Sequence, residues 1–325
     1  MTSLLLFIYI LVIVWSVTPL KRNKRTIRDI CYEWKTDTGL FTPRKLNVDL
    51  TADPPFNRKR GILPGEDGGR HVLKNITIPP PVLSAAQKAG QEFLNEDWTY
   101  TSTEGQDKLV IQLLQGKRNG FFIDVGARYW NKGSNSFSLE YYYDWKGICV
   151  EPDERMYTGL VVNRTCTVIC ENPIDTYLNQ SVYFNYQIGG YHRTGSIGSM
   201  KVTVTLKEIL SSFKLPSIID YLSLDIEGHE YQAMLSVDLN QYTFLIISVE
   251  RPPPFLHLKL TYHGYSWLTQ LPGYFGEMIY IHHSLNNFTN VMNAYRPSAS
   301  SYYQKSDNKY FHEPPWPKRQ PPIIK

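Results

Sequence analysis

Four ionisable side chains follow an apolar segment in the sequence YLSLDIEGHEYQAM, at residues 221–234. A carboxylate or an imidazole at the end of a strand can remove a proton from a bound hydroxyl group. We therefore predict Asp225 or Glu227 as the general base of an active site, with His229 as a further candidate. A capping or surface position explains His229 equally well, and Glu230 fits better as an acid that the helix dipole favours. A divalent metal held by Asp225, Glu227 and Glu230 is an alternative, but one turn is weak support and we assign no metal ligand.

Acidic residues also end other apolar segments, and these segments alternate with helical ones along the chain. The sequences GFFIDVG, GICVEP and CTVICEN each carry an acid at or just after the end of an apolar run. Apolar strands that alternate with helices predict an α/β fold, in which a parallel sheet is covered on both faces. The carboxyl ends of parallel strands meet at one edge, where ligands bind. We therefore expect Asp124, Glu151 and Asp225 to gather at that edge.

The predicted edge has features of a nucleoside-binding site. Gly126 would permit a tight turn and the close approach of a ligand to the backbone, and Glu151 would accept hydrogen bonds from a ribose diol. A helix that starts near Ser134 would direct its first amides at a carboxylate or phosphate. The turn GARYWNKG lacks the G-x-G-x-x-G pattern, because Arg128 and Tyr129 stand where a pyrophosphate needs glycine. A nucleoside with a small charged tail is therefore expected, and a nicotinamide dinucleotide is not.

Taken together, these segments resemble a known protein family. The sequences NGFFIDVGARYWNKGSNSFSLE, WKGICVEP, TVTLKEIL, IDYLSLDIEGHEYQAM and FLIISVE are similar, in order and spacing, to the FkbM-type S-adenosylmethionine-dependent methyltransferases. The likeness runs over residues 105–283. The sequences QD at 106–107, EPD at 151–153 and NR at 163–164 further resemble the animal branch of this family, which includes the membrane protein Star.

The resemblance implies a fold, a cofactor and a set of site residues. The fold is a Rossmann-like class I methyltransferase fold, with a mostly parallel seven-stranded sheet, an antiparallel seventh strand and helices on both faces. The implied cofactor is S-adenosyl-L-methionine. By matching position, its binding residues are Asp124, Gly126, Ser134, Asn135 and Glu151. The family's D-x-E-G at the fourth strand matches Asp225, Glu227 and Gly228, which is the stretch that also suggests the general base.

Two functions are consistent with these features. The first is O-methylation of a hydroxyl group on a glycan or small molecule. The alternative, which the likeness to the animal branch implies, is a catalytically inactive protein that binds a cargo or partner protein in the secretory pathway. His192 and Arg193 lie in a glycine-rich insertion that would face the acceptor, although a plain turn is the simpler interpretation. The formal charge is only +4, and no predicted helix carries a basic stripe, so no nucleic-acid partner is expected.

The two ends of the chain differ in composition from the middle. Residues 1–20 carry the apolar run LLLFIYILVIVWSV and predict a signal peptide or, if uncleaved, a membrane anchor. Residues 21–104 read as a stem or linker with a short helix, residues 105–283 as the methyltransferase-like domain, and residues 284–325 as an extended Pro- and Tyr-rich tail. The basic run KRNKR would hold the body of an uncleaved protein in the cytosol.

Glycosylation sequons and cysteines bear on the compartment. Sequons at Asn75, Asn163, Asn179 and Asn287 favour a body in the lumen of the secretory pathway, either anchored to the membrane or secreted. The chain has four cysteines, at positions 31, 149, 166 and 170. The last two lie on one predicted strand, with Cα atoms roughly 13 Å apart, too far for a disulfide bond. We interpret all four as buried free thiols.

Overall fold

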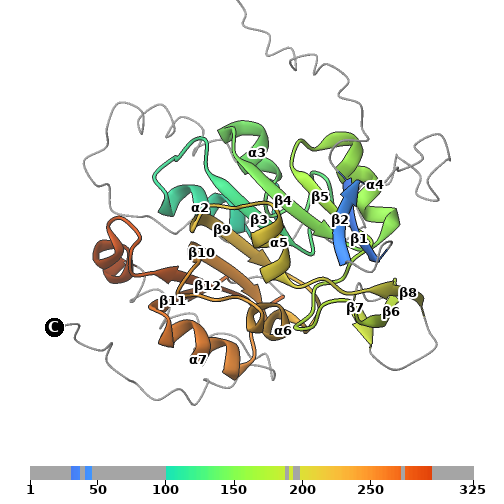
Figure 1. Cartoon of the computed structure of the whole chain (residues 1–325). Coiled ribbons are helices and arrows are strands. Elements are labelled where there is room, and N and C mark those ends of the chain that lie inside the picture. The colour runs from blue at the N-terminus through green and yellow to red at the C-terminus, as the bar shows by residue number, and fades with distance from the viewer. Residues whose placement is uncertain are drawn as a thin grey trace, which may run out of the picture.

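The structure, a computed structural model, describes residues 31–36, 41–45, 100–186, 190–192, 198–271 and 275–294. Its centre is one large sheet (Figure 1), whose strands are, in spatial order, β11 (Tyr265–Gln270), β12 (Glu277–His282), β10 (Thr243–Glu250), β9 (Ile218–Leu224), β3 (Phe121–Val125), β4 (Lys146–Glu151), β5 (Thr167–Cys170), β1 (Cys31–Thr36) and β2 (Phe41–Lys45). The predicted leader, the predicted stem helix and the predicted tail beyond residue 294 lie outside the described residues. Residues 288–294 are helical, and Leu285 and Val291 are buried in the apolar core, so the prediction of an extended tail from residue 284 is wrong for this part. Within the described residues, no helix has the length and apolarity that a membrane span requires.

The sheet is mostly parallel, as predicted. Strand β9 pairs in parallel with both β3 and β10, and β4 pairs in parallel with both β3 and β5. Strand β12 runs antiparallel between β10 and β11, which confirms the expected antiparallel strand. The chain progresses from β3 towards β5 in one direction and from β9 towards β12 in the other. The order therefore reverses between β3 and β9, and in open α/β sheets ligands bind beyond the strand ends at such a point.

Among the described residues, the sheet has nine strands, two more than the prediction of seven. The additional strands β1 and β2 form an antiparallel pair, and β1 extends the sheet by pairing in parallel with β5. Both lie in the segment that the sequence assigned to the stem. Trp34 of β1 is buried, and its backbone N–H and C=O both bond to the side chain of Asn172 at distances of 2.7 and 3.3 Å. Part of the predicted stem is thus an integral edge of the domain.

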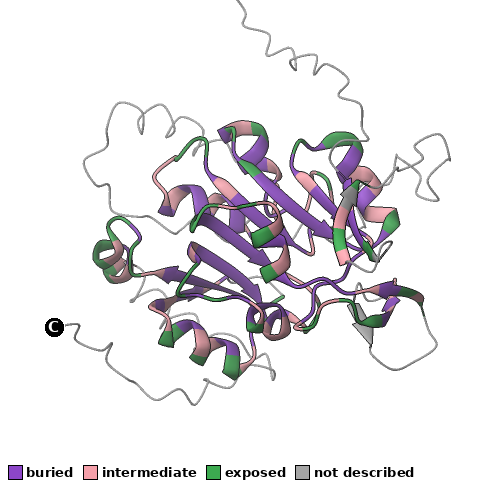
Figure 2. Cartoon of the chain, viewed as in Figure 1, coloured by how far each residue is buried: buried purple, intermediate pink, exposed green. Residues whose placement is uncertain are grey.

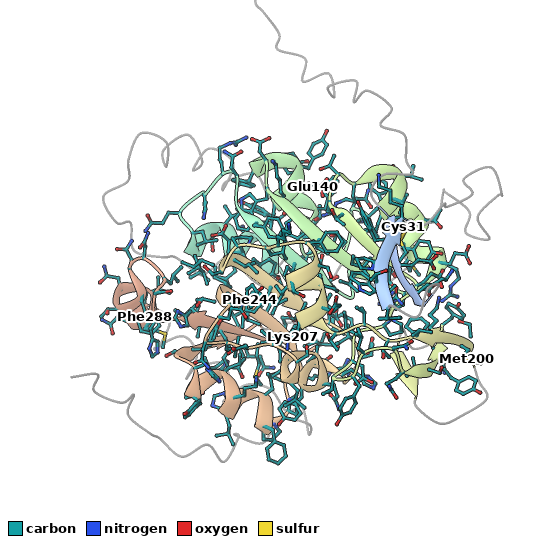
Figure 3. All side chains as sticks on the ribbon, viewed as in Figure 1. Cys31, Glu140, Met200, Lys207, Phe244 and Phe288 are labelled. Carbon is teal, nitrogen blue, oxygen red and sulfur yellow. A yellow bond between two sulfur atoms is a disulfide. The ribbon has the colours of Figure 1, made fainter. Side chains whose placement is uncertain are left out.

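A disulfide bond attaches β1 to the end of β5. Cys31 is bonded to Cys170 across 139 residues of sequence, and Figure 3 labels Cys31 on β1. The prediction of free thiols is therefore wrong for this pair, because it treated the stem as separate from the sheet. Cys149 and Cys166 are free and buried, as predicted, with their Sγ atoms 2.7 Å apart.

Helices cover the two faces of the sheet. Helices α2 (Gln106–Leu113), α3 (Phe137–Tyr143) and α4 (Glu154–Asn163) pack into one apolar core, and α5 (Leu206–Ser212), α6 (Glu230–Leu235) and α7 (Pro254–Tyr262) pack into the other. Along β3 the side chains alternate between the two faces, because Phe122 belongs to the first core and Ile123 to the second. Figure 2 shows the buried central strands and the exposed outer sides of the helices. This arrangement confirms helices on both faces.

Local sequence explains several of the element boundaries. Asp153 caps α4 by accepting the Arg155 backbone N–H, and Thr205 caps α5 by accepting the Glu208 N–H at 3.0 Å. The helix expected near Ser134 begins at Phe137 instead. A separate small sheet consists of β6 (Ser181–Asn185), β7 (Gly190–His192) and β8 (Ser199–Val202), in the region of the glycine-rich insertion.

The disulfide gives a testable stability prediction. Reduction with a phosphine should lower the melting temperature of the full chain by several degrees, because a cross-link closing a loop of this length contributes about 2–5 kcal/mol. The Cys31→Ala variant should melt at the lower temperature with or without reductant. If reduction still destabilises Cys31→Ala, the effect of the reductant does not come from the Cys31–Cys170 bond.

Candidate functional site

Polar side chains gather on one face of the sheet near the carboxyl ends of its strands. Asp124 follows Phe122 and Ile123, so strand alternation directs it towards the face covered by α2, α3 and α4. The same alternation brings other polar residues to this face: Glu151 on β4, Ser223 on β9, Ser248 and Glu250 on β10, and Glu277 on β12. All of them are buried. An apolar sheet face thus becomes polar where the ligand site is expected.

Gly126 is required by the neighbouring strand. Its φ is +85°, and a Cβ at this position would lie 1.8 Å from the backbone oxygen of Asp225. The Asp225 N–H in turn donates to the carbonyl of Val125 at 3.0 Å. The close approach that the sequence suggested is therefore made by the backbone after β9. It brings the ends of β3 and β9 together at the reversal point of the sheet.

Three of the predicted cofactor-binding residues bond within the protein. Asp124 accepts a hydrogen bond from the Ser136 hydroxyl at 2.5 Å, and Asn135 donates to Ser223 at 3.0 Å. Ser134 Oγ accepts the backbone N–H groups of Ser136 and Phe137 at 3.3 and 3.2 Å. Ser134 thus bonds to the first amide of α3 and to the amide before it, at the helix start where the anion site was expected.

A buried ion pair fixes this loop from the other side. Arg164 is fully buried and donates to Glu140 at 2.8 Å, to Ser134 Oγ at 3.1 Å and to Ser136 Oγ at 3.0 Å. Burial would raise the pKa of Glu140, but Arg164 and Thr165 outweigh it, and the pKa is lowered. Figure 3 labels Glu140 on α3. The NR sequence at 163–164 thus supports the loop that carries Ser134 and Asn135.

Glu151 lies at the end of β4, beside the turn after β3. Its two oxygens accept the backbone N–H groups of Arg128 and Asp153, both at 2.8 Å. Burial raises the pKa of Glu151 to about 7. Each carboxylate oxygen has a second lone pair that can accept a further hydrogen bond. Glu151 therefore orders two loops and keeps acceptor capacity for a ligand hydroxyl.

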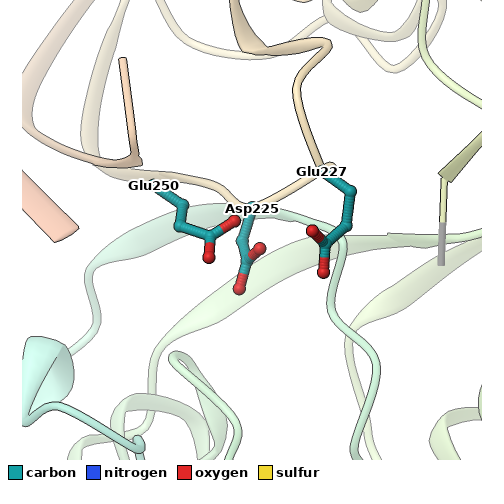
Figure 4. A group of neighbouring side chains, drawn as sticks. All are labelled: Asp225, Glu227 and Glu250. Carbon is teal, nitrogen blue, oxygen red and sulfur yellow. The ribbon is translucent and has the colours of Figure 1, made fainter. Parts of the chain in front are cut away.

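Three carboxylates lie together beyond the ends of β9 and β10. One oxygen each from Asp225, Glu227 and Glu250 lies within 4.8 Å of the others (Figure 4). Burial, together with the charges of Glu250 and Glu277, raises the pKa of Asp225 well above its ordinary value. Burial and Glu250 also raise the pKa of Glu227, although Arg251 opposes this through an ion pair at 3.1 Å. A carboxylate with a raised pKa is a better proton acceptor near neutral pH.

His229 and Glu230 are outside this group. Glu230 is buried, and its Oε1 accepts the backbone N–H groups of Ile226 and Gly228 at 3.2 and 3.0 Å. Glu230 therefore stabilises the turn that carries Glu227. His229 is the residue before α6, and its side chain does not cap that helix.

The backbone is strained along the same edge. Arg128, Glu171, Glu227 and Arg251 follow β3, β5, β9 and β10, and all have positive φ values between 44° and 67°. Residues other than glycine adopt this conformation at a cost, and such residues concentrate at functional sites. The strain therefore supports a function at the carboxyl ends of these strands.

Comparisons with known proteins agree with this architecture. Residues 124–280 match the methyltransferase FkbM domain. The chain contains an FkbM methyltransferase domain. The matched segment runs from Asp124 at the end of β3 to Tyr280 on β12, and the fold is a Rossmann-like methyltransferase fold, as the sequence predicted.

Among solved structures there is a distant similarity, and among curated proteins there is none. The chain is similar to the precorrin-6y C5,15-methyltransferase of Geobacter metallireducens GS-15, with 13% identity over 54% of this chain and 84% of that chain and a TM-score of 0.29. A search of curated proteins gave no match.

Within the FkbM domain, sequence reasoning missed Glu250 and Arg251. Glu250 ends β10 in the same way that Glu151 ends β4, so the repeated pattern of an acid at a strand end was the available signal. The structure brings the predicted Asp225 and Glu227 to Glu250 and does not bring His229 there. The roles of the predicted cofactor-binding residues remain predictions.

Two further buried acids extend this cluster away from the edge. Glu250 is directly opposite Glu277 on β12, and Glu104 lies near Glu277. Glu104 accepts the Phe275 N–H at 2.7 Å, while its second oxygen has no partner among the described residues. Burial raises the pKa of Glu104 to about 7.

Glu104 gives a prediction about pH. Between its ordinary pKa of 4.5 and about 7, the folded chain holds a proton that the unfolded chain releases. The free energy of unfolding should therefore fall as pH rises through this window, by about 1 kcal/mol between pH 6 and pH 8 for this residue. Glu104→Gln keeps an oxygen that can accept the Phe275 N–H. The variant should lose about 1 kcal/mol less free energy of unfolding between pH 6 and pH 8 than the wild type, as measured by urea unfolding at both pH values.

The exposed Glu154, on α4, supplies the matched control for this experiment. Glu154→Gln should leave the pH dependence of unfolding as it is in the wild type. An unchanged pH dependence in Glu104→Gln as well would show that Glu104 is charged in the folded protein at pH 6.

Proposed function

We propose that the FkbM domain is an S-adenosylmethionine-dependent O-methyltransferase that acts on a hydroxyl group of a glycan or small molecule. The observation that carries this proposal is the position of Asp225. Its carboxyl group, with a raised pKa, lies beyond β9 at the point where the strand order reverses. A hydroxyl acceptor must lose a proton during methyl transfer, and a carboxylate placed here is suited to take it.

Glu151 supports the assignment of the cofactor. It lies two strands away from Asp225 in the same sheet, across β3 and its Gly126 turn. The remaining lone pairs of its buried carboxylate suit the diol of a ribose. When bound, S-adenosylmethionine supplies an electrophilic methyl group. The protein then has to align acceptor and methyl group, exclude water and receive the proton.

Cofactor titration tests this function. Isothermal titration of the purified full chain should give one site for S-adenosylmethionine. Glu151→Gln should weaken binding by about tenfold or more, because it removes charged hydrogen bonds worth roughly 1.5–3 kcal/mol each. Asp225→Asn should keep binding and lower transfer of labelled methyl to a panel of hydroxyl compounds by about two orders of magnitude. The absence of heat at millimolar ligand, with folded protein, would rule out this function.

Glu151→Gln requires a stability control. Glu151 bonds to the backbone amides of Arg128 and Asp153 and therefore also contributes to folding. The variant should therefore melt below the wild type, and binding should be compared at a temperature where both are folded. Glu154→Gln, three residues further on and exposed, is the matched variant that should bind normally.

We further propose that the domain resides in the lumen of the secretory pathway. A structural disulfide such as Cys31–Cys170 is typical of oxidising compartments. The sequons at Asn163, Asn179 and Asn287 are all exposed, so their side chains are accessible to a glycan.

Expression in secreting cells tests the compartment. We expect Asn75 and at least one of Asn163, Asn179 and Asn287 to carry a glycan, so that treatment with an N-glycosidase increases electrophoretic mobility. Replacing each asparagine by glutamine in turn should reproduce a part of that shift. If the enzyme leaves the mobility unchanged, the luminal assignment fails and the basic KRNKR run places the body in the cytosol.

A second candidate function is binding of a cargo or partner protein without catalysis. It is favoured by the internal bonding of Asp124, Ser134 and Asn135, which the resemblance would assign to the cofactor. The bulky residues Arg128 and Tyr129 in the turn after β3 also favour this candidate. Retained cofactor binding together with methyl transfer would exclude this candidate, whereas a folded chain that binds no cofactor would favour it.

A further inference from the structure

The carboxylates of Asp225, Glu227 and Glu250 are arranged as oxygen donors around one point. They come from two neighbouring strand ends, and Figure 4 shows their carboxyl groups directed to the same side of the ribbon. Carboxylate oxygens at this spacing suit hard divalent cations such as Mg²⁺, Mn²⁺ or Ca²⁺. An acidic cluster alone does not establish a site, since exposed acids often gather without one.

The second observation is the unsatisfied oxygen of Glu250. Its side chain is 3% exposed, and Oε2 is buried and has no hydrogen-bond partner in the described part of the chain. Its other oxygen, Oε1, bonds to Arg251. A buried carboxylate oxygen without a partner is costly. Because the Glu250 carboxyl group points towards Asp225 in Figure 4, a ligand between them would satisfy this oxygen.

The cluster and its surroundings carry more negative than positive charges. Arg251 pairs with Glu227 and Glu250 and is half exposed, whereas Asp225 makes no ion pair within the described residues. Arg128 faces Glu227 at longer range, and Glu277 adds a further acid beside Asp225. A divalent cation would supply positive charge and take the carboxylate oxygens as ligands. Arg251 alone does not balance the negative charge of the cluster.

We propose that Asp225, Glu227 and Glu250 bind one hard divalent cation. The binding itself follows from the three carboxylates alone. Its role rests on the proposed function: a cation here would bind the oxygen of the acceptor hydroxyl and position it for methyl transfer. Arg251 would then hold the outer side of Glu227 and Glu250 in position.

Titration with Mn²⁺ tests the site. Binding removes the electron paramagnetic resonance signal of free Mn²⁺. The titration should show one ion bound per full chain, with a dissociation constant of about 1 mM or below. Glu250→Gln and Glu227→Gln should each weaken binding by about tenfold or more, and Glu154→Gln should not change it. Arg251→Gln should retain or tighten binding, because it removes a competing cation. Mg²⁺ should displace Mn²⁺ from the wild type.

The outcomes separate this inference from the proposed function. No Mn²⁺ binding by wild-type protein that melts cooperatively would overturn the site, as would equal binding by wild type, Glu250→Gln and Glu227→Gln. Glu227 is the more exposed ligand, so its variant stays informative if Glu250→Gln fails to fold. S-adenosylmethionine is titrated in a separate experiment without metal. Cofactor binding without Mn²⁺ binding would overturn only the cation site, and the reverse result would overturn only the methyltransferase assignment.

Discussion

The approach of the Asp225 backbone to Gly126 is the constraint on which the candidate site depends. A side chain at position 126 would collide with the Asp225 carbonyl, since even a Cβ would be only 1.8 Å away. Without this contact, β3 and β9 would separate at their carboxyl ends, and Asp225 would move away from the turn that leads to Glu151. The glycine that the sequence suggested for a ligand therefore first serves the sheet. It sets the distance between the two halves of the domain at the place where their order reverses.

Much of the architecture could be predicted from sequence because it depends on local pattern. Apolar strands ended by acids predicted the parallel sheet, and the stretch at residues 221–234 predicted Asp225 and Glu227. Glu250 was missed because only the pairing of β9 with β10 brings it to Asp225. The pairing of β1 with β5 was missed for the same reason. Its partners are far apart in sequence, and β1 and β2 lie in a segment rich in proline and charge.

The predicted binding residues show a second limit of sequence reasoning. Ser134, Asn135 and Asp124 are polar residues at the correct edge, yet each of them bonds to another part of the protein. A sequence shows that a polar side chain needs a partner, but the partner can be a ligand or a backbone amide. Only the geometry distinguishes the two. The buried Arg164–Glu140 pair shows how much of this polar face is internal scaffolding.

The disulfide between Cys31 and Cys170 has a consequence for proteolysis. Residues 46–99 connect β2 to Tyr100 in the sequence, so a protease that cuts once between them divides the chain into two fragments. The two fragments nevertheless stay joined through the sulfur atoms, and β1 stays beside β5. A cut at the basic run KRNKR, before Cys31, instead separates everything that precedes it from the domain. The position of a single cysteine thus decides which cleavages change the composition of the mature protein and which leave only a nick.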